Sequence, residues 1–92
     1  ILIEKQGIKI ERILSKGHVS PDGFWYDQKE DEWTALLKGN AVLEYSDGSE
    51  ITLEAGDLLF IPAGKKHRIK YTSDDPECEW FCVFIYPGNE DK

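Results

Sequence analysis

The residues of this sequence best suited to chemistry are a carboxyl group, Glu32, and an imidazole, His67. Such a pair can move a proton near neutral pH when its surroundings separate the two pKa values. The same groups can bind a divalent metal, and Asp27 would add a second carboxylate. Ligation of this kind suits Mn²⁺, with Fe²⁺, Zn²⁺ and Ni²⁺ as further candidates. The residues therefore leave proton transfer and metal binding open.

Alternating strands are expected to position these side chains. Turn signals recur about every eight to twelve residues, which is typical of all-β sandwiches and barrels. Apolar and polar residues alternate over 41–45 and 51–54, so each segment is predicted to be a strand with one packed and one wet face. Asp47-Gly48 between them predicts a two-residue hairpin turn, which needs positive φ at both residues. Residues 4–14 are predicted to form one further strand.

Two segments, 58–61 and 80–86, are apolar on both faces and need cover inside the fold or at a subunit interface. Residues 1–3 add further apolar side chains that a chain of 92 residues cannot easily cover. The sequence therefore predicts a homodimer.

A turn before His67 places this residue at the start of a strand. Pro62 ends the preceding apolar segment because it cannot donate to a sheet, and Gly64 allows the chain to reverse. Period-two alternation then puts His67 on the same face as Ile69 and Tyr71, which we expect to be the interior. The imidazole is thus predicted at the rim of a barrel.

These positions resemble the two motifs of the cupin superfamily. The matching residues, at the family's spacing, are Glu32, Gly39, Gly56, Pro62, Gly64 and His67. Tyr71 stands where the family usually has Asn. The resemblance implies an all-β double-stranded β-helix, or jelly-roll barrel, as a single domain over residues 1–92. From its polar residues, the end of the sequence at 88–92 is expected to be a loose tail. Small cupins commonly dimerise, which agrees with the expected homodimer.

The two histidines of the first cupin motif are absent. With one family spacing Trp25 and Asp27 replace them, and with the other Tyr26 and Gln28 do. The usual three-histidine set is therefore not carried over, and oxygen chemistry that needs two histidines and a carboxylate is disfavoured. His18, on a loop beside a glycine, is interpreted as an exposed turn residue.

Aromatic residues occupy the place of the missing ligands and could form the wall of a pocket for a small planar compound. Alternatively, Trp25 fills core volume, since a small barrel has little space to spare. The expected pocket residues are Trp25, Tyr26, Asp27, Gln28, Glu32, His67 and Tyr71. The candidate metal ligands among them are Asp27, Glu32 and His67.

The amino-acid composition disfavours certain kinds of binding partner. Eighteen acidic residues against eleven Lys and Arg give a net charge of −7, which disfavours nucleic acid and anionic membranes. Cys78 and Cys82 lie about 13 Å apart if they share a strand, too far for a disulfide, so they are expected to be free. No export signal is visible, and we expect a cytoplasmic protein.

Two functions remain open. The first is a binding or regulatory module that holds a small molecule, with or without a weakly bound divalent metal. The second is an isomerase, epimerase or lyase in which His67 and Glu32 transfer a proton. Binding is favoured because the residues that a cupin enzyme most often needs have been replaced.

Overall fold

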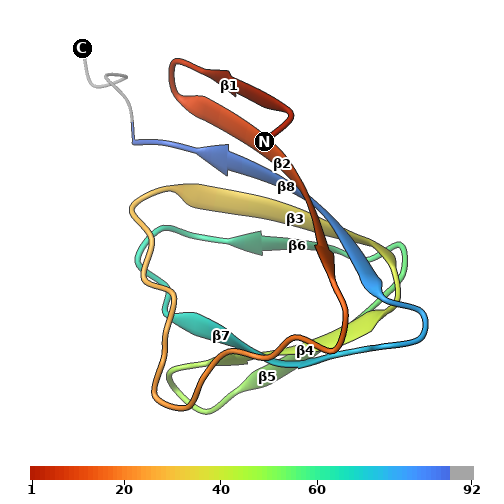
Figure 1. The fold of residues 1–92 in the computed structure, drawn as a ribbon. Coiled ribbons are helices and arrows are strands. Elements are labelled where there is room, and N and C mark those ends of the chain that lie inside the picture. Colours follow the sequence, from red (N-terminus) through yellow and green to blue (C-terminus); the bar gives the residue numbers. More distant parts are fainter. Residues whose placement is uncertain (88–92) are drawn as a thin grey trace.

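The structure is a computed structural model that describes residues 1–87, and in this range the chain forms strands and no helix (Figure 1). The strands are β1 (Ile3–Lys5), β2 (Ile8–Ser15), β3 (Asp31–Lys38), β4 (Asn40–Tyr45), β5 (Glu50–Glu54), β6 (Leu58–Ile61), β7 (His67–Thr72) and β8 (Cys78–Ile85). The all-β prediction is confirmed. No helix that could cross a membrane is found in these residues. The predicted loose tail, 88–92, lies outside them.

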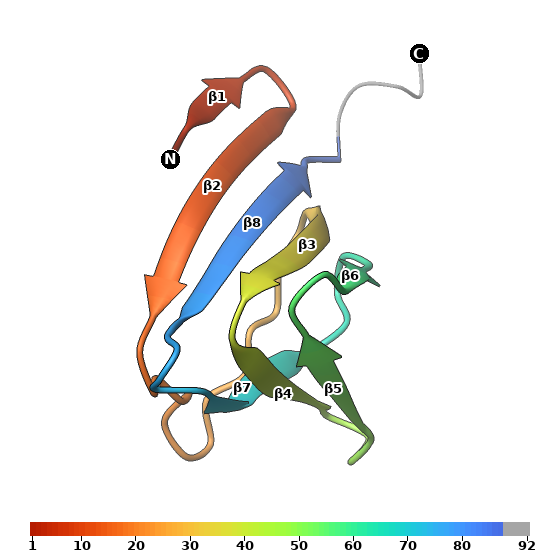
Figure 2. The same cartoon turned by 90° about the vertical axis from the view of Figure 1, so that its right-hand side faces the viewer.

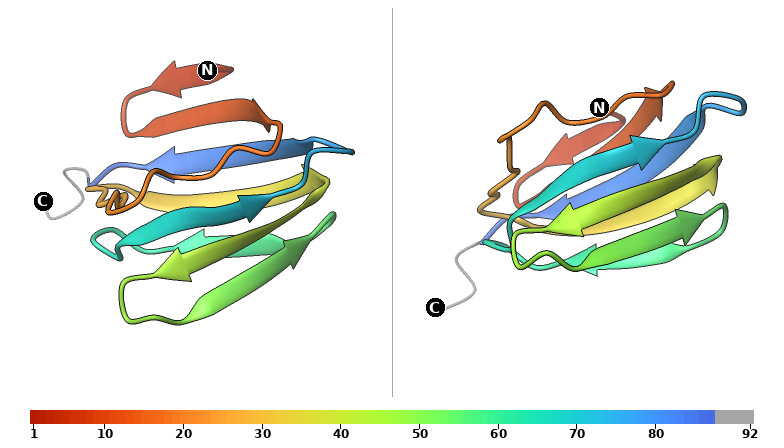
Figure 3. Two further views of the ribbon diagram at one scale, coloured as in Figure 1. Left: turned by 60° about the horizontal axis from the view of Figure 1, so that its bottom comes forward. Right: turned by 90° about the horizontal axis from the view of Figure 1, so that it is seen from below.

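Two antiparallel sheets face each other. The larger has the strand order β1-β2-β8-β3-β6, and the smaller has the order β5-β4-β7. Figure 2 shows the chain leaving β3 in the larger sheet and entering β4 in the smaller one. Figure 3 shows the two sheets from the side of the smaller sheet. Strands that are distant in the sequence therefore become neighbours, as β2 and β8 do across the full length of β2.

The crossing from β3 to β4 depends on Gly39. This residue has a φ of +88°, and a Cβ atom placed on it would lie 2.6 Å from the Ser73 hydroxyl and 3.1 Å from the Cα of Cys78. A side chain at position 39 would therefore both strain the backbone and collide with the segment that leads into β8. The packing explains why a glycine stands at the end of the first motif.

The core lies between the sheets and is built from inward-facing residues of both. Its buried members are Leu36, Ala41, Leu43, Leu53, Ile61, Cys78, Trp80, Cys82 and Phe84. In β8 every second residue points inward, which gives the alternation of buried and more exposed positions along this strand. The apolar run 80–86 therefore contributes one face to the core and one to the exterior.

Two turns differ from the sequence-based prediction. The expected single N-terminal strand is a hairpin, because the chain reverses at Gly7 between β1 and β2. In the β4–β5 hairpin Gly48 has a φ of +90° but Asp47 does not have positive φ. Gly48 N–H donates to Tyr45 O at 2.9 Å, and Tyr45 N–H donates to Ser49 O at 2.8 Å. The loop is therefore a three-residue turn closed by glycine, not the primed two-residue turn.

A bulge between β4 and β7 changes the prediction for Tyr71. Val42 pairs with Tyr71 and Leu43 pairs with Ile69, so β7 contains one extra residue at this point. The extra residue reverses the in–out alternation after Ile69. Thr72 consequently faces inward and is buried, whereas Tyr71 is 47% exposed. The sequence-based placement of Tyr71 inside the barrel is wrong for this reason.

Much of the outside of the larger sheet is apolar. We call it the outer apolar face, and it comprises Ile8, Trp33, Ala35, Leu58, Phe60, Phe81, Val83 and Ile85. The Trp33 and Phe60 rings lie 4.8 Å apart, and Leu58 is 63% exposed. A shallow hollow in this face is lined by Trp33, Ala35, Leu58, Phe81 and Val83. The expected cover for segment 58–61 is thus not supplied on this side by residues 1–87 of the same chain.

Candidate ligand-binding cavity

A cavity of about 390 Å³ lies between the two sheets, which is within the usual range for small-molecule sites. We call it the central cavity. Its apolar lining consists of Ile13, Leu43, Ile61, Ile69, Trp80, Cys82 and Phe84. Its polar lining consists of Lys9, Glu11, Ser15, His18, Tyr26, Gln28, Glu30, Glu32, Thr34, His67 and Thr72. Many polar groups thus converge on a largely apolar space.

His67 is a deeply buried residue of the cavity wall, with 4% of its surface exposed. Its Nδ1 lies 3.0 Å from the carbonyl oxygen of Lys65. A carbonyl oxygen can only accept, so Nδ1 carries the proton and Nε2 of the neutral ring is an acceptor. Within residues 1–87, Nε2 has no hydrogen-bond partner. The ring therefore reaches the cavity as a fixed group with one free nitrogen.

Tyr26 is held directly against His67. Tyr26 N–H donates to His67 O at 2.7 Å, and His67 N–H donates to Tyr26 O at 3.1 Å. The two rings are stacked with their centroids 5.3 Å apart. Gly64 N–H donates to Gln28 O at 2.8 Å, which joins the same two segments a second time. Backbone pairing therefore fixes Tyr26 and Gln28 beside His67.

This pairing decides which residues replace the missing histidines. Tyr26 and Gln28 line the central cavity, whereas Trp25 and Asp27 lie outside it. Asp27 is exposed, and Trp25 is half-buried with the Arg68 guanidinium 5.9 Å from its ring centroid. Adjacent residues of an extended segment point to opposite sides, so only one of the two pairs could face inward.

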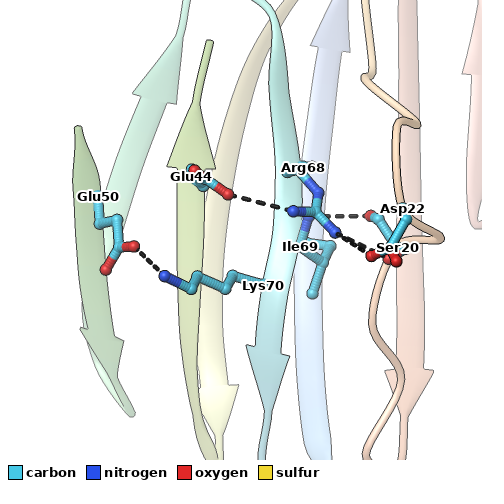
Figure 4. Close-up of polar contacts among 7 residues, drawn as sticks. All are labelled: Ser20, Asp22, Glu44, Glu50, Arg68, Ile69 and Lys70. Atoms are coloured by element: carbon cyan, nitrogen blue, oxygen red, sulfur yellow. Dashed lines mark hydrogen bonds and ion pairs between the residues drawn. The ribbon is translucent and has the colours of Figure 1, made fainter. Parts of the chain in front are cut away.

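A half-buried arginine, Arg68, holds the chain around Ser20 and Asp22 on the outside of β7, as Figure 4 shows. Arg68 donates to Glu44 Oε1 at 3.2 Å and to the carbonyl oxygen of Ser20 at 3.1 Å. It also lies 3.9 Å from Asp22. Ser20 N–H donates to Ile69 O at 2.9 Å, and Ile69 N–H donates to the Ser20 hydroxyl at 2.9 Å. These contacts hold the segment that carries Tyr26 and Gln28 against the sheet.

Glu32 supplies a buried carboxyl group from β3, with 8% of its surface exposed. The side-chain amide of Gln28 donates to Glu32 Oε1 at 3.2 Å. Burial raises the pKa of Glu32, while the Gln28 hydrogen bond and the nearby His67 offset part of this rise. Glu32 is thus a carboxyl group whose charged form is disfavoured by its surroundings.

Cys82 lies next to Glu32 on the cavity wall but is not a nucleophile. Its Sγ lies 3.1 Å from the Thr34 hydroxyl. Burial raises the pKa of the Cys82 thiol to about 12, so the thiol is protonated at neutral pH. Cys78 and Cys82 are both free and buried, as the sequence predicts.

The predicted pocket residues divide into two groups. Tyr26, Gln28, Glu32 and His67 line the central cavity, and Trp25, Asp27 and Tyr71 do not. The metal set of Asp27, Glu32 and His67 is therefore not brought together. Within residues 1–87, no group of three or more His, Cys, Asp or Glu side chains is placed to hold a metal. Beside Glu32 and His67, the cavity has the phenol of Tyr26 and the amide of Gln28 where a usual cupin metal centre has two histidines. These residues therefore do not fit such a metal centre.

Other cavity residues were missed by sequence reasoning. Lys9 and Glu11 lie on β2, and their polar positions alternate with the isoleucines that identify this strand. This alternation could have indicated that Lys9 and Glu11 share one face of β2. That polar face is the one that points into the cavity. His18, interpreted as an exposed turn residue, is exposed and also lines the cavity. Glu30, part of an acidic run, lines the cavity as well.

Two facing antiparallel sheets around a cavity define the double-stranded β-helix class of proteins. A family model described as "Cupin domain" matches residues 12–84. The chain belongs to this cupin family, which confirms the resemblance seen in its motifs. No curated protein sequence matches the chain.

Solved structures agree with this assignment. A protein from Ralstonia eutropha JMP134, provisionally named a mannose-6-phosphate isomerase, is 38% identical with a TM-score of 0.88, over 92% of this chain and 80% of that one. An RmlC-like cupin from Methanocaldococcus jannaschii is 20% identical with a TM-score of 0.76, over 91% and 74%. A cupin superfamily protein from Desulfitobacterium hafniense DCB-2 is 21% identical with a TM-score of 0.77, over 92% and 72%. At this level of sequence identity, the similarity to the last two proteins supports the fold alone.

Proposed function

We propose that this protein binds a small molecule in the central cavity. The observation that carries the proposal is the free Nε2 of the buried His67, which lines a cavity of about 390 Å³ without a hydrogen-bond partner in residues 1–87. The residue is buried but this nitrogen is not shielded from the cavity, so a donor group of a ligand can reach it. Glu32 adds a second buried polar group on the same wall.

The tryptophans offer a test with a control inside the same molecule. Trp80 lines the central cavity, and its indole N–H donates to the Ser15 hydroxyl at 3.0 Å. Trp33 lies on the outer apolar face. In a fragment screen followed by NMR, cavity ligands should move the indole signal of Trp80 and leave that of Trp33 in place. Fragments that move only Trp33 would contradict the proposal.

Proton transfer is a second candidate function, favoured by one specific observation. Glu32, whose pKa is raised by burial, and His67, whose Nε2 is free, line the same cavity. The name of the Ralstonia relative suggests an isomerase acting on a sugar phosphate. Incubation with mannose 6-phosphate in heavy water tests this candidate. Deuterium uptake at carbon with the wild type and none with His67→Ala would support it, and equal uptake by both would contradict it.

We also propose a homodimer in which two copies meet through the outer apolar face. Exposed apolar patches that include aromatic residues commonly mark interfaces. A two-fold contact suits this patch because the same surface then covers both copies. The exposed Leu58 and the Trp33–Phe60 pair would be its centre.

A cytoplasmic location remains our proposal as well. Both cysteines are free and buried, and free thiols are typical of reducing compartments. The net charge of −7 supports a partner other than nucleic acid or an anionic membrane.

A further inference from the structure

We propose that the ligand of the central cavity is a small organic cation that also carries a hydrogen-bond donor, such as a hydroxylated alkylammonium. This inference rests on the proposed binding function and adds the charge and chemistry of the ligand. It comes from the side chains that line the cavity and from the ion pairs that they do and do not form.

Carboxyl groups outnumber ammonium groups on the cavity wall, which also carries the imidazoles of His18 and His67. Glu11, Glu30 and Glu32 contribute carboxyl groups, whereas Lys9 contributes the one ammonium group of the lining. Low-dielectric walls of one charge sign concentrate ions of the opposite sign. A phosphate or carboxylate ligand would instead meet three carboxyl groups on entering.

One of these carboxyl groups already has a cation. The Lys9 ammonium lies 3.8 Å from Glu11 and 4.9 Å from the centroid of the Phe84 ring. The protein thus places one of its own amines against an aromatic ring and a carboxylate at this wall. Cation–π attraction and charge pairing act together in that position.

The other two carboxyl groups lack a cation. Among residues 1–87 neither Glu30 nor Glu32 forms an ion pair. Glu32 is 8% exposed, and its carboxyl group accepts a hydrogen bond from Gln28 and lies beside the Cys82 thiol. A carboxylate buried without a counterion is costly. A cationic ligand would supply a full positive charge at a place where the protein provides only the nearby His67 imidazole.

The remaining wall suits the rest of such a ligand. Tyr26, Trp80 and Phe84 provide aromatic surface for an alkylammonium group. Because Nδ1 of His67 is held by Lys65 O, Nε2 of the neutral ring can accept a hydrogen bond from a ligand hydroxyl or N–H. Cation and donor would therefore be bound by different residues of one cavity.

Choline and its uncharged isostere, 3,3-dimethylbutan-1-ol, separate charge from shape. We expect choline to move the Trp80 indole signal and to bind about tenfold more tightly than the isostere in calorimetry at pH 8. Glu32→Gln should weaken choline binding about tenfold and leave the isostere unchanged, which also shows that the cavity is intact. Glu54→Gln is the matched control, because Glu54 is exposed and lies outside the cavity lining.

Three outcomes would overturn the cation assignment. The isostere could bind as tightly as choline, mannose 6-phosphate could move Trp80 at lower concentrations than choline, or choline could have no effect up to tens of millimolar. In each case the fragment screen still decides separately whether the cavity binds small molecules. A failure of the charge assignment is thereby distinguished from a failure of the binding function.

Discussion

The imidazole of His67 is oriented by the backbone carbonyl of Lys65, two residues earlier, with 3.0 Å between Nδ1 and the oxygen. The orienting group belongs to the turn that precedes β7, so it does not depend on any residue of the cavity wall. Substitutions elsewhere in the cavity should therefore leave the tautomer of His67 unchanged.

Because Glu32 ionises inside the fold, its contribution to the free energy of unfolding should depend on pH. Its pKa is raised above the ordinary 4.5 by burial. A carboxyl group with a raised folded-state pKa stabilises the fold fully below the unfolded-state value, and this stabilisation is lost as the pH rises through the folded-state value. Glu32→Gln should thus gain stability relative to wild type as the pH rises above the unfolded-state value. Urea unfolding at several pH values measures this, and a pH-independent difference would contradict it.

Gly39→Ala should destabilise the protein strongly. The added Cβ meets the Ser73 hydroxyl at 2.6 Å in a backbone with φ +88°, so we expect a loss of about 2–4 kcal/mol in the free energy of unfolding. Gly23→Ala is the control, because Gly23 has a similar φ of +79° and no atom within 4 Å of the added Cβ. Strain alone there should cost about 1 kcal/mol. Equal losses in chemical denaturation would rule out the close contact as the cause.

Arg68→Ala should loosen the segment that carries Tyr26 and Gln28. The variant removes the contacts to Glu44 and to the Ser20 carbonyl, and we expect a loss of about 2–3 kcal/mol. Amide hydrogen exchange at Tyr26 should accelerate. The control is Lys70→Ala on the same strand, whose pair with Glu50 is exposed and worth about 0–1 kcal/mol (Figure 4). Protection of Tyr26 that survives Arg68→Ala would show that the pairing with His67 suffices.

Neither thiol should react in the folded protein. Cys78 is fully buried, and the pKa of Cys82 is about 12. Treatment with iodoacetamide at pH 8 should leave both unlabelled in mass spectra, whereas protein in urea should be labelled at both. Rapid labelling of native Cys82 would mean that its thiolate is far more accessible than its burial indicates.

Leu58→Lys should convert the proposed dimer to a monomer. Leu58 is 63% exposed at the hollow of the outer apolar face, where a charge would be buried in the assembly. Light scattering after size-exclusion chromatography measures the mass. Val19→Lys is the control, because Val19 is also exposed but does not belong to that face. A wild type that is monomeric at micromolar concentrations would refute the homodimer.

Sequence reasoning was accurate where a local pattern determines the outcome. Period-two alternation predicted the strands around Ala41, Leu43 and Leu53, all of which are buried. Motif spacing predicted that Glu32 and His67 would line one space. These results depend on side-chain periodicity and on turn residues, which a single sequence contains.

It failed where long-range pairing determines the outcome. Tyr71 faces outward because of a bulge opposite Val42, and alternation within β7 cannot reveal a bulge that depends on register with β4. The choice between Trp25 and Tyr26 was open until the pairing of Tyr26 with His67 was known. Both cases concern which face of the chain a residue occupies, and one residue of register reverses that face.

The backbone hydrogen bonds that join residues 26 and 28 to the turn around Gly64 have an evolutionary consequence. Main-chain pairing is insensitive to side-chain identity at these two positions, so a lineage can exchange imidazoles for a phenol and an amide without dismantling the scaffold. The barrel fold can then be kept while substitutions at positions 26 and 28 change the chemistry of the cavity. In this barrel, ancestry is consequently a better guide to shape than to chemistry.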